Sequence, residues 1–133
     1  MASRLADFVR WLDVIPGRNW LVVGYTGNAF SAEIEATLPA GVTKVDILET
    51  NPWTLPFEAG TYDVALTLQW REPDSRQLLE ELKRVVVPGG IVAACLPQSQ
   101  IGRGELMQLF KQAGLHAVQS RDLAPAAAAK GIR

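Results

Sequence analysis

The apolar residues of this chain follow two different periods in alternating segments. Four segments repeat an apolar residue every third or fourth position, as amphipathic helices do, and short apolar or alternating runs between them are typical of strands. This alternation predicts an α/β fold with a mainly parallel sheet and right-handed crossovers. The predicted helices start after Ser3 and cover 29–37, 74–87 and 104–112, and the predicted strands cover 19–23, 44–48, 62–68, 91–96 and 115–120.

Two segments fall outside the alternation. Residues 51–61 contain Pro52, Pro56 and Gly60, and they therefore predict a loop, although an apolar one. The final residues are rich in alanine and end in polar side chains, which predicts a frayed helix or a disordered tail. The expected organisation is a single domain over 1–123 followed by a C-terminal tail over 124–133.

Composition narrows the class of protein. Apolar residues make up 48% of the chain, charged residues 20%, and the formal net charge is −1, so no basic surface for nucleic acid is expected. The apolar stretches are too short for a membrane span, and the single cysteine, Cys95, suits a reducing compartment. Cys95 lies in an apolar run and is expected to be a core side chain. We therefore expect a soluble, cytoplasmic protein without a metal site.

The predicted topology brings three loops together. In open parallel sheets, ligands bind beyond the carboxyl ends of the strands, near the point where the strand order reverses. Residues 24–28, 49–53 and 68–70 follow three of the predicted strands and should meet at this edge. His116 lies away from it and is expected to be structural or exposed, while Asp63 is expected to fix local backbone.

Four sequence segments, taken in order, resemble class I S-adenosylmethionine-dependent methyltransferases. They are "DFVRWLDVIPGRNWLVVGYTGNAFSAEI", "LPFEAGTYDVALTLQW", "LLEELKRVVVPGGIVAACLP" and "ELMQLFKQAGLHAVQSRDL". The first carries a glycine loop and the third a Pro-Gly-Gly turn before a strand, and the resemblance extends from about residue 6 to residue 123. It implies a three-layer Rossmann-like methyltransferase fold with a mainly parallel sheet, and S-adenosylmethionine as cofactor.

The chain departs from the family pattern in three places. Val22 stands where the family usually has an acidic residue two positions before the first glycine. Thr26 and Asn28 replace later glycines of the loop, so this glycine motif is degenerate. The span between Gly24 and Asp63 is also too short for two strand–helix units of ~30 residues each. The fold is therefore expected to lack one strand–helix unit after the first helix.

This shortening leaves two alignments open for "KVDILETNPWTLPF". If its strand is the family's second strand, Glu49 is the acidic residue that takes the ribose hydroxyls. If it is the third strand, Asn51 replaces the residue that contacts the adenine amino group. The "LPF" that follows locally favours the alignment as the third strand. One strand of this chain could also stand for both the second and the third strand of the family.

The resemblance implies a cofactor site and a substrate site. Methyl transfer is an in-line displacement that mainly needs binding and orientation, so no catalytic residue is assigned. Glu49 could instead be a solvated charge, and Trp53 and Phe57 could be core side chains of the loop. The cofactor-binding candidates are Gly24, Tyr25, Thr26, Gly27, Asn28, Glu49, Asn51, Trp53 and Leu55, and the substrate candidates are Gln69 and Trp70.

Two functions are compatible with these features. The first is a methyltransferase that acts on a small soluble acceptor. The second is a catalytically inactive methyltransferase-like domain used in protein interaction or assembly. The loss of one crossover would expose a sheet edge, which predicts a homodimer or a protein partner.

Overall fold

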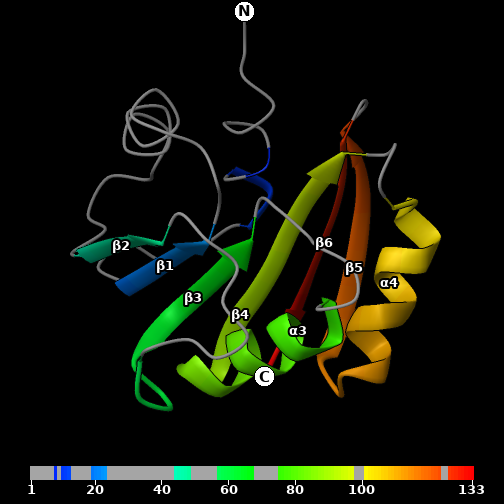
Figure 1. Ribbon diagram of the computed structural model, residues 1–133. Helices are drawn as coiled ribbons and strands as arrows, with labels where there is room; N and C mark the ends of the chain where they lie inside the picture. The colour runs from blue at the N-terminus through cyan, green and yellow to red at the C-terminus, as the bar shows by residue number, and fades with distance from the viewer. Residues whose placement is uncertain are drawn as a thin grey trace, which may run out of the picture.

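The computed structural model describes residues 8, 10–12, 19–23, 44–48, 57–67, 75–97, 101–123 and 126–133. Figure 1 shows a twisted sheet with the helices α3 and α4 on one side of it. The elements are β1 (Asn19–Val23), β2 (Lys44–Leu48), β3 (Tyr62–Thr67), α3 (Ser75–Val85), β4 (Val86–Pro97), α4 (Arg103–Gln112), β5 (His116–Leu123) and β6 (Ala126–Ile132).

The six strands form one mixed sheet with the order β2-β1-β3-β4-β6-β5. The strands β2, β1, β3 and β4 are parallel to their neighbours, whereas β6 is antiparallel to both β4 and β5. In the described part of the chain, one strand, β2, stands between β1 and β3 in sequence. The predicted Rossmann-like α/β fold is thus confirmed, and the described part of the chain between β1 and β3 contributes one strand to the sheet.

Period-two alternation along the strands divides the core between the two faces of the sheet. Leu21 and Ala65 face one core cluster, in which they meet the apolar side chains of α3 and α4. Val22 and Leu66, one position along each strand, face a second cluster on the opposite side, together with Phe8 and neighbouring helical residues of the N-terminal segment. Burial on both faces gives the three layers of the predicted fold.

The helix α3 follows its predicted pattern closely. Its apolar face, Leu78, Leu79, Leu82 and Val85, is buried in the first cluster, and exposed polar residues such as Arg76 occupy the other side. Asp74, the predicted first residue of this helix, lies outside the described residues. The period of the apolar residues predicted the buried face of α3 correctly, because one stripe of this helix packs on the sheet.

The start of β4 corrects one prediction. The sequence predicted a strand over 91–96 after a Pro-Gly-Gly turn, but β4 begins at Val86 and includes that turn. The pairing with β3 shifts register between Tyr62 and Val64, and Gly89 adopts a φ of +85° inside the strand. The prediction failed because Pro88 and two glycines normally mark a break, and here they form an irregularity within a strand.

The C-terminal segment contradicts the prediction of a frayed or disordered tail over 124–133. Ala126–Ile132 form β6, which is inserted between β4 and β5 (Figure 1). Ala127, Ala128 and Ala129 are fully buried. Alanine has low strand propensity, so the local sequence did not indicate a strand. Its small side chain fits an inner strand that is covered by packed residues on both faces.

Cys95 lies on β4 and packs, half-buried, against the second core cluster, as predicted. Burial raises the pKa of its thiol to about 11 from an ordinary value of 9.0, because the charged thiolate is poorly solvated there. At neutral pH the thiol is protonated and unreactive.

A pH dependence of stability follows from this raised pKa. The unfolded chain loses the thiol proton near pH 9 and the folded chain near pH 11, so the contribution of Cys95 to stability is full below pH 9 and is lost as the pH rises to 11. We expect Cys95→Ala to show a shallower fall in the urea midpoint than the wild type across this window. Parallel curves for the two proteins would contradict the assignment.

Candidate functional site

Three parallel strands end at the same level of the sheet. Val23, at the end of β1, is paired with Leu48 of β2 on one side and with Thr67 of β3 on the other. Thr67 is in turn paired with Ala94, beyond which β4 continues to Pro97. Since β2 and β3 lie on opposite sides of β1, this edge is the switch point at which doubly wound sheets bind ligands.

The predicted site residues attach directly to these strand ends. Gly24 follows Val23, Glu49 follows Leu48, and Leu68, next to Gln69 and Trp70, follows Thr67. These residues, and the rest of the predicted site (Tyr25, Thr26, Gly27, Asn28, Asn51, Trp53 and Leu55), lie outside the described residues. Their roles remain predictions. What the structure shows is where the preceding strands, β1, β2 and β3, end.

The structure also places Asp63, at the amino end of β3, and Val22, next to the carboxyl end of β1. The Asp63 carboxylate accepts a hydrogen bond from the backbone N–H of Asn19 at 2.9 Å, so it joins the start of β1 to β3. This is the structural role predicted for Asp63. Val22, at the position where an acidic residue is usual, is fully buried among apolar side chains of the second cluster. His116 is exposed on the far strand β5.

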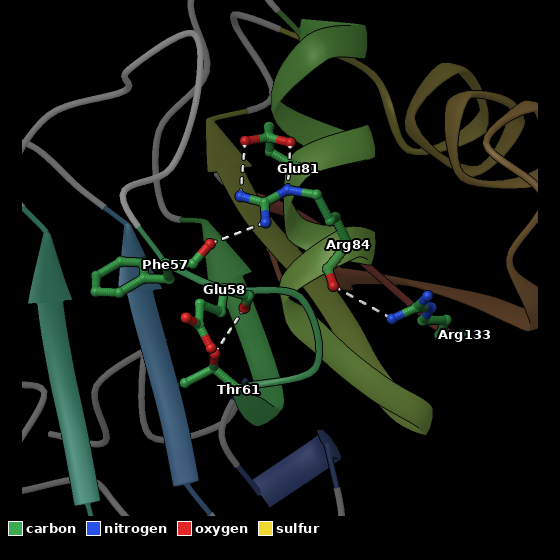
Figure 2. Close-up of polar contacts among 6 residues, drawn as sticks. All are labelled: Phe57, Glu58, Thr61, Glu81, Arg84 and Arg133. Atoms are coloured by element: carbon green, nitrogen blue, oxygen red, sulfur yellow. Dashed lines mark hydrogen bonds and ion pairs between the residues drawn. The ribbon is translucent and has the colours of Figure 1, made fainter.

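A polar network ties the end of α3 to the turn that precedes β3 (Figure 2). The Arg84 guanidinium donates two hydrogen bonds to the Glu81 carboxylate, at 2.8 and 3.0 Å, and a third to the Phe57 carbonyl at 2.8 Å. The Arg84 carbonyl accepts hydrogen bonds from the Gly60 N–H at 3.0 Å and from the Arg133 side chain at 3.2 Å. One residue thus contacts the turn both through its side chain and through its main chain.

Glu81 and Arg84 form an ion pair within this network. The Glu81 side chain is only 9% exposed, and a carboxylate so placed requires a close partner. The hydrogen bond to Glu81 raises the pKa of Arg84, so the guanidinium remains protonated in the folded protein. Phe57 packs edge-on against Tyr62, with ring centroids 5.3 Å apart, as expected of a loop side chain that belongs to the core.

The cavities found among the described residues lie away from the strand ends. One of about 220 Å³ lies between α3 and α4, and another of about 170 Å³ lies beside Ile91, in the middle of β4, and Lys130 of β6. Both volumes are below the roughly 300 Å³ at which ligand pockets usually begin. Neither cavity is therefore a candidate for the cofactor site.

Glu81 and Arg84 were not among the residues predicted from the sequence to be functional. A signal was present, because opposite charges at positions i and i+3 of a helix face the same side. Such pairs are common on solvated helix surfaces, so the spacing alone does not indicate a contact with Phe57. That contact depends on how α3 packs against the turn at residues 57–61.

Comparison with known proteins defines the class. The fold is shared with a methyltransferase from Aquifex aeolicus described as SAM-dependent (TM-score 0.70, 14% identity, 97% of this chain and 90% of that chain). It is also shared with the 1,6-didemethyltoxoflavin-N1-methyltransferase of Burkholderia thailandensis, whose structure contains S-adenosylhomocysteine (TM-score 0.68, 13% identity, 98% of this chain and 76% of that chain). The protein has the fold of the class I S-adenosylmethionine-dependent methyltransferases.

The particular family follows from the sequence comparisons. Residues 24–117 match the model of the ubiE/COQ5 methyltransferase family. The chain is 32% identical over 99 residues to the demethylmenaquinone methyltransferase of Bacillus subtilis (strain 168), which is 71% of this chain and 42% of that protein. This chain belongs to the ubiE/COQ5 methyltransferase family, and it spans about two-fifths of the length of the curated relatives that it matches.

The helices α3 and α4 have 11 and 10 residues. None of those in the described part of the chain is both long and apolar enough to cross a bilayer.

Proposed function

We propose that this chain binds S-adenosylmethionine across the carboxyl ends of β1, β2 and β3 and transfers its methyl group to a small-molecule acceptor. The observation that carries the proposal is the family match, which begins at Gly24, directly after β1, and includes the segments that follow β2 and β3. Their strands end in register at the switch point of the sheet, where a ligand can contact all three segments.

The position of β2 supports one of the two open alignments. In a doubly wound sheet of order 3-2-1-4-5-6, the second strand is the neighbour of the first. The strand β2 pairs along its whole length with β1 and ends in register with it. This favours the alignment in which Glu49, directly after β2, accepts the ribose hydroxyls. One strand then stands for both family strands, and we propose that Asn51, Trp53 and Leu55, in the segment after Glu49, contact the adenine.

The residues at this edge fit the cofactor with one exception. A glycine directly after β1 allows the backbone to approach the ligand closely, and an acidic residue after β2 supplies hydrogen-bond acceptors. The exception is Val22, because its buried apolar surroundings offer the methionine end no carboxylate. We propose that main-chain groups of residues 24–28 hold that end instead.

The chemistry requires little more than positioning. When bound, S-adenosylmethionine would supply a methyl group on a sulfonium, with S-adenosylhomocysteine as the leaving group and the acceptor's proton released to solvent. The chain's task is to orient the acceptor in line and to exclude water. Gln69 and Trp70, just after β3, are proposed to contact the acceptor, and an aromatic face there would favour the cationic sulfur.

We also propose an acceptor class, a location and a mode of assembly for this protein. The relatives are named for demethylmenaquinone, so reduced quinone rings are the first acceptors to test, with smaller soluble aromatic compounds next. The single cysteine supports a cytoplasmic location. The strand β2 is an edge of the described sheet, which supports the predicted homodimer or protein partner through that edge.

Titration calorimetry with S-adenosylmethionine and S-adenosylhomocysteine tests the proposal. We expect both ligands to bind, and we expect Gly24→Val and Glu49→Ala each to weaken binding about tenfold, equivalent to ~1.4 kcal/mol. Glu80→Ala, an exposed residue on α3, is the matched control and should bind as the wild type does.

Absence of heat at near-millimolar ligand would exclude the enzyme and would support the catalytically inactive interaction domain instead. Binding with unchanged affinity in both variants would place the cofactor elsewhere on the molecule.

A further inference from the structure

We propose that the cavity beside Lys130 is a binding site for a small aromatic carboxylate. The apolar side chains of Leu12, Ile91 and Ile132 form part of its walls. Lys130 and Gln119 also line it, so a cation and an amide stand among apolar side chains. A few polar groups in a mainly apolar site are the usual means of orienting a ligand. This composition matches a ligand with an apolar body and one anionic group.

The size of the cavity limits the apolar body to one ring. An apolar cavity of roughly 150 Å³ is enough to hold one benzene ring, and this cavity measures about 170 Å³. It also lies apart from the strand ends, because Ile91 is paired with Val64 in the first half of β3, whereas the cofactor is proposed to bind beyond Thr67. The cavity is therefore a separate site, and its assignment does not rest on the proposed function.

The position of the Lys130 ammonium is fixed by Trp11. Its Nζ donates to the Trp11 carbonyl at 2.7 Å and lies 4.7 Å from the centre of the Trp11 ring. An ammonium carries three N–H donors, so a carboxylate can accept a hydrogen bond from the same group. Because the cation is already held in place, a charge-assisted hydrogen bond to a ligand requires little further ordering.

Gln119 provides a second polar group on the same side of the sheet. It is directly opposite Lys130 in the pairing of β5 with β6, and side chains of directly opposite residues lie on the same face. The Gln119 side chain is exposed, and its amide can donate a hydrogen bond to the carboxylate that Lys130 binds. Two donors thus converge at one end of the apolar space.

An irregularity in β5 forms another part of the cavity wall. Between His116 and Gln119 this strand has one residue more than the facing segment of β6, from Ile132 to Lys130, which is the pattern of a bulge. Ala117, within the bulge, lines the cavity and has a φ of +50°, in the left-handed region that alanine seldom adopts. Bulges and strained residues are concentrated beside binding sites. The bulge therefore supports the site independently of Lys130.

Benzoate and benzamide are the probes for this site, because they share the ring and differ in charge. We expect benzoate to bind the full chain with a Kd of about 1 mM or below, and to bind about tenfold more tightly than benzamide. In two-dimensional amide NMR spectra, benzoate should shift the backbone amides of Gln119, Lys130 and Ile132. These shifts should persist when S-adenosylhomocysteine is present.

Two variants test the contribution of the charge. Lys130→Met removes the ammonium and keeps an unbranched side chain, so it should weaken benzoate about tenfold and leave benzamide unchanged. Gln119→Glu places a carboxylate opposite Lys130 and leaves Lys130 and Trp11 themselves unaltered, so it should weaken benzoate in the same direction. This second variant changes an exposed residue and decides the question if Lys130→Met does not fold.

Lys111→Met is the matched control. It makes the same change of charge at an exposed position on α4, and it should keep the affinity of the wild type for benzoate. The amide spectrum and melting temperature of each variant show whether it is folded.

Three results would overturn the site. The first is the absence of amide shifts in the wild type with benzoate at about 10 mM, tenfold above the expected Kd. The second is displacement of benzoate by S-adenosylhomocysteine, because benzoate would then occupy the proposed cofactor site. The third is an unchanged benzoate affinity in folded Lys130→Met or Gln119→Glu, because the ammonium would then make no contribution to binding.

Discussion

Removal of Ala126–Arg133 is expected to abolish cooperative folding. The truncation deletes β6, which pairs with β4 along seven positions from Ile91 to Pro97 and with β5 on its other side. It would expose the inner edge of β4 and would leave β5 and α4 without the strand that joins them to the sheet. Since a domain of this size is stabilised by only about 5–15 kcal/mol, the loss of an inner strand exceeds what the fold can lose.

The deletion also removes contacts to distant parts of the chain. The Lys130 ammonium donates to the Trp11 carbonyl at 2.7 Å and lies 4.7 Å from the centre of the Trp11 ring. The Arg133 side chain bonds to the carbonyl of Arg84. The C-terminal segment therefore holds both the N-terminal helical residues and the end of α3.

The measurement is urea unfolding followed by near-ultraviolet circular dichroism and tryptophan fluorescence. The truncated chain should lack a cooperative transition and a structured near-ultraviolet spectrum. The matched control is Ile132→Ala, which shortens a side chain that is 40% exposed and keeps the strand. It should unfold cooperatively and remain close to the wild type in stability. A cooperative transition of the truncated chain at the wild-type midpoint would contradict the role of β6.

Substitution of Gly90 by alanine is expected to reduce the free energy of unfolding by about 3 kcal/mol, at the upper end of the range for overpacking. A Cβ at this position would lie 2.8 Å from the Asp63 carbonyl oxygen and 2.9 Å from that of Val87. Both are backbone atoms of paired strands, so they cannot rotate away as a side chain could. The strands β3 and β4 would have to separate at the irregularity that begins β4.

Gly104→Ala is the control for this substitution. Gly104 lies in α4, and a Cβ built there meets no atom within 4 Å. Alanine has the higher helix propensity, so this variant should be equal to the wild type or more stable by up to ~1 kcal/mol. Urea midpoints of both variants give the comparison. Equal stability of Gly90→Ala and the wild type would mean that β4 does not approach Asp63 as closely as the structure shows.

A disturbance at Gly90 should also reach the proposed site. Asp63 joins β3 to the start of β1 through its bond to Asn19, and β1 and β3 end at the edge where the cofactor is proposed to bind. The contact between the amino ends of β1 and β3 therefore helps to fix the register of these strands, whose carboxyl ends form the proposed site. We therefore expect Gly90→Ala to weaken binding at the proposed site as well as to lower stability.

The sequence by itself determined those parts of the protein that depend on local periodicity. The buried face of α3 and the runs of β1 and β3 were predicted because each of these elements buries one stripe or one apolar run, and β2 was predicted from the period-two alternation of "KVDIL". The candidate site was also predicted, since in a doubly wound sheet the order of the strands decides which loops meet. In the structure β1, β2 and β3 end at one level, and the roles of the residues that follow them remain predictions.

Only the tertiary structure decided the features that depend on residues far apart in the chain. The alanines of β6 carry no strand signal, and they form an inner strand because the space between β4 and β5 accepts small buried side chains. The Pro-Gly-Gly segment belongs to β4 because Asp63 of another strand lies against Gly90. The bond from Arg84 to Phe57 joins residues 27 positions apart. No local pattern encodes such a contact, because it exists only when the helix and the loop are packed against the same sheet.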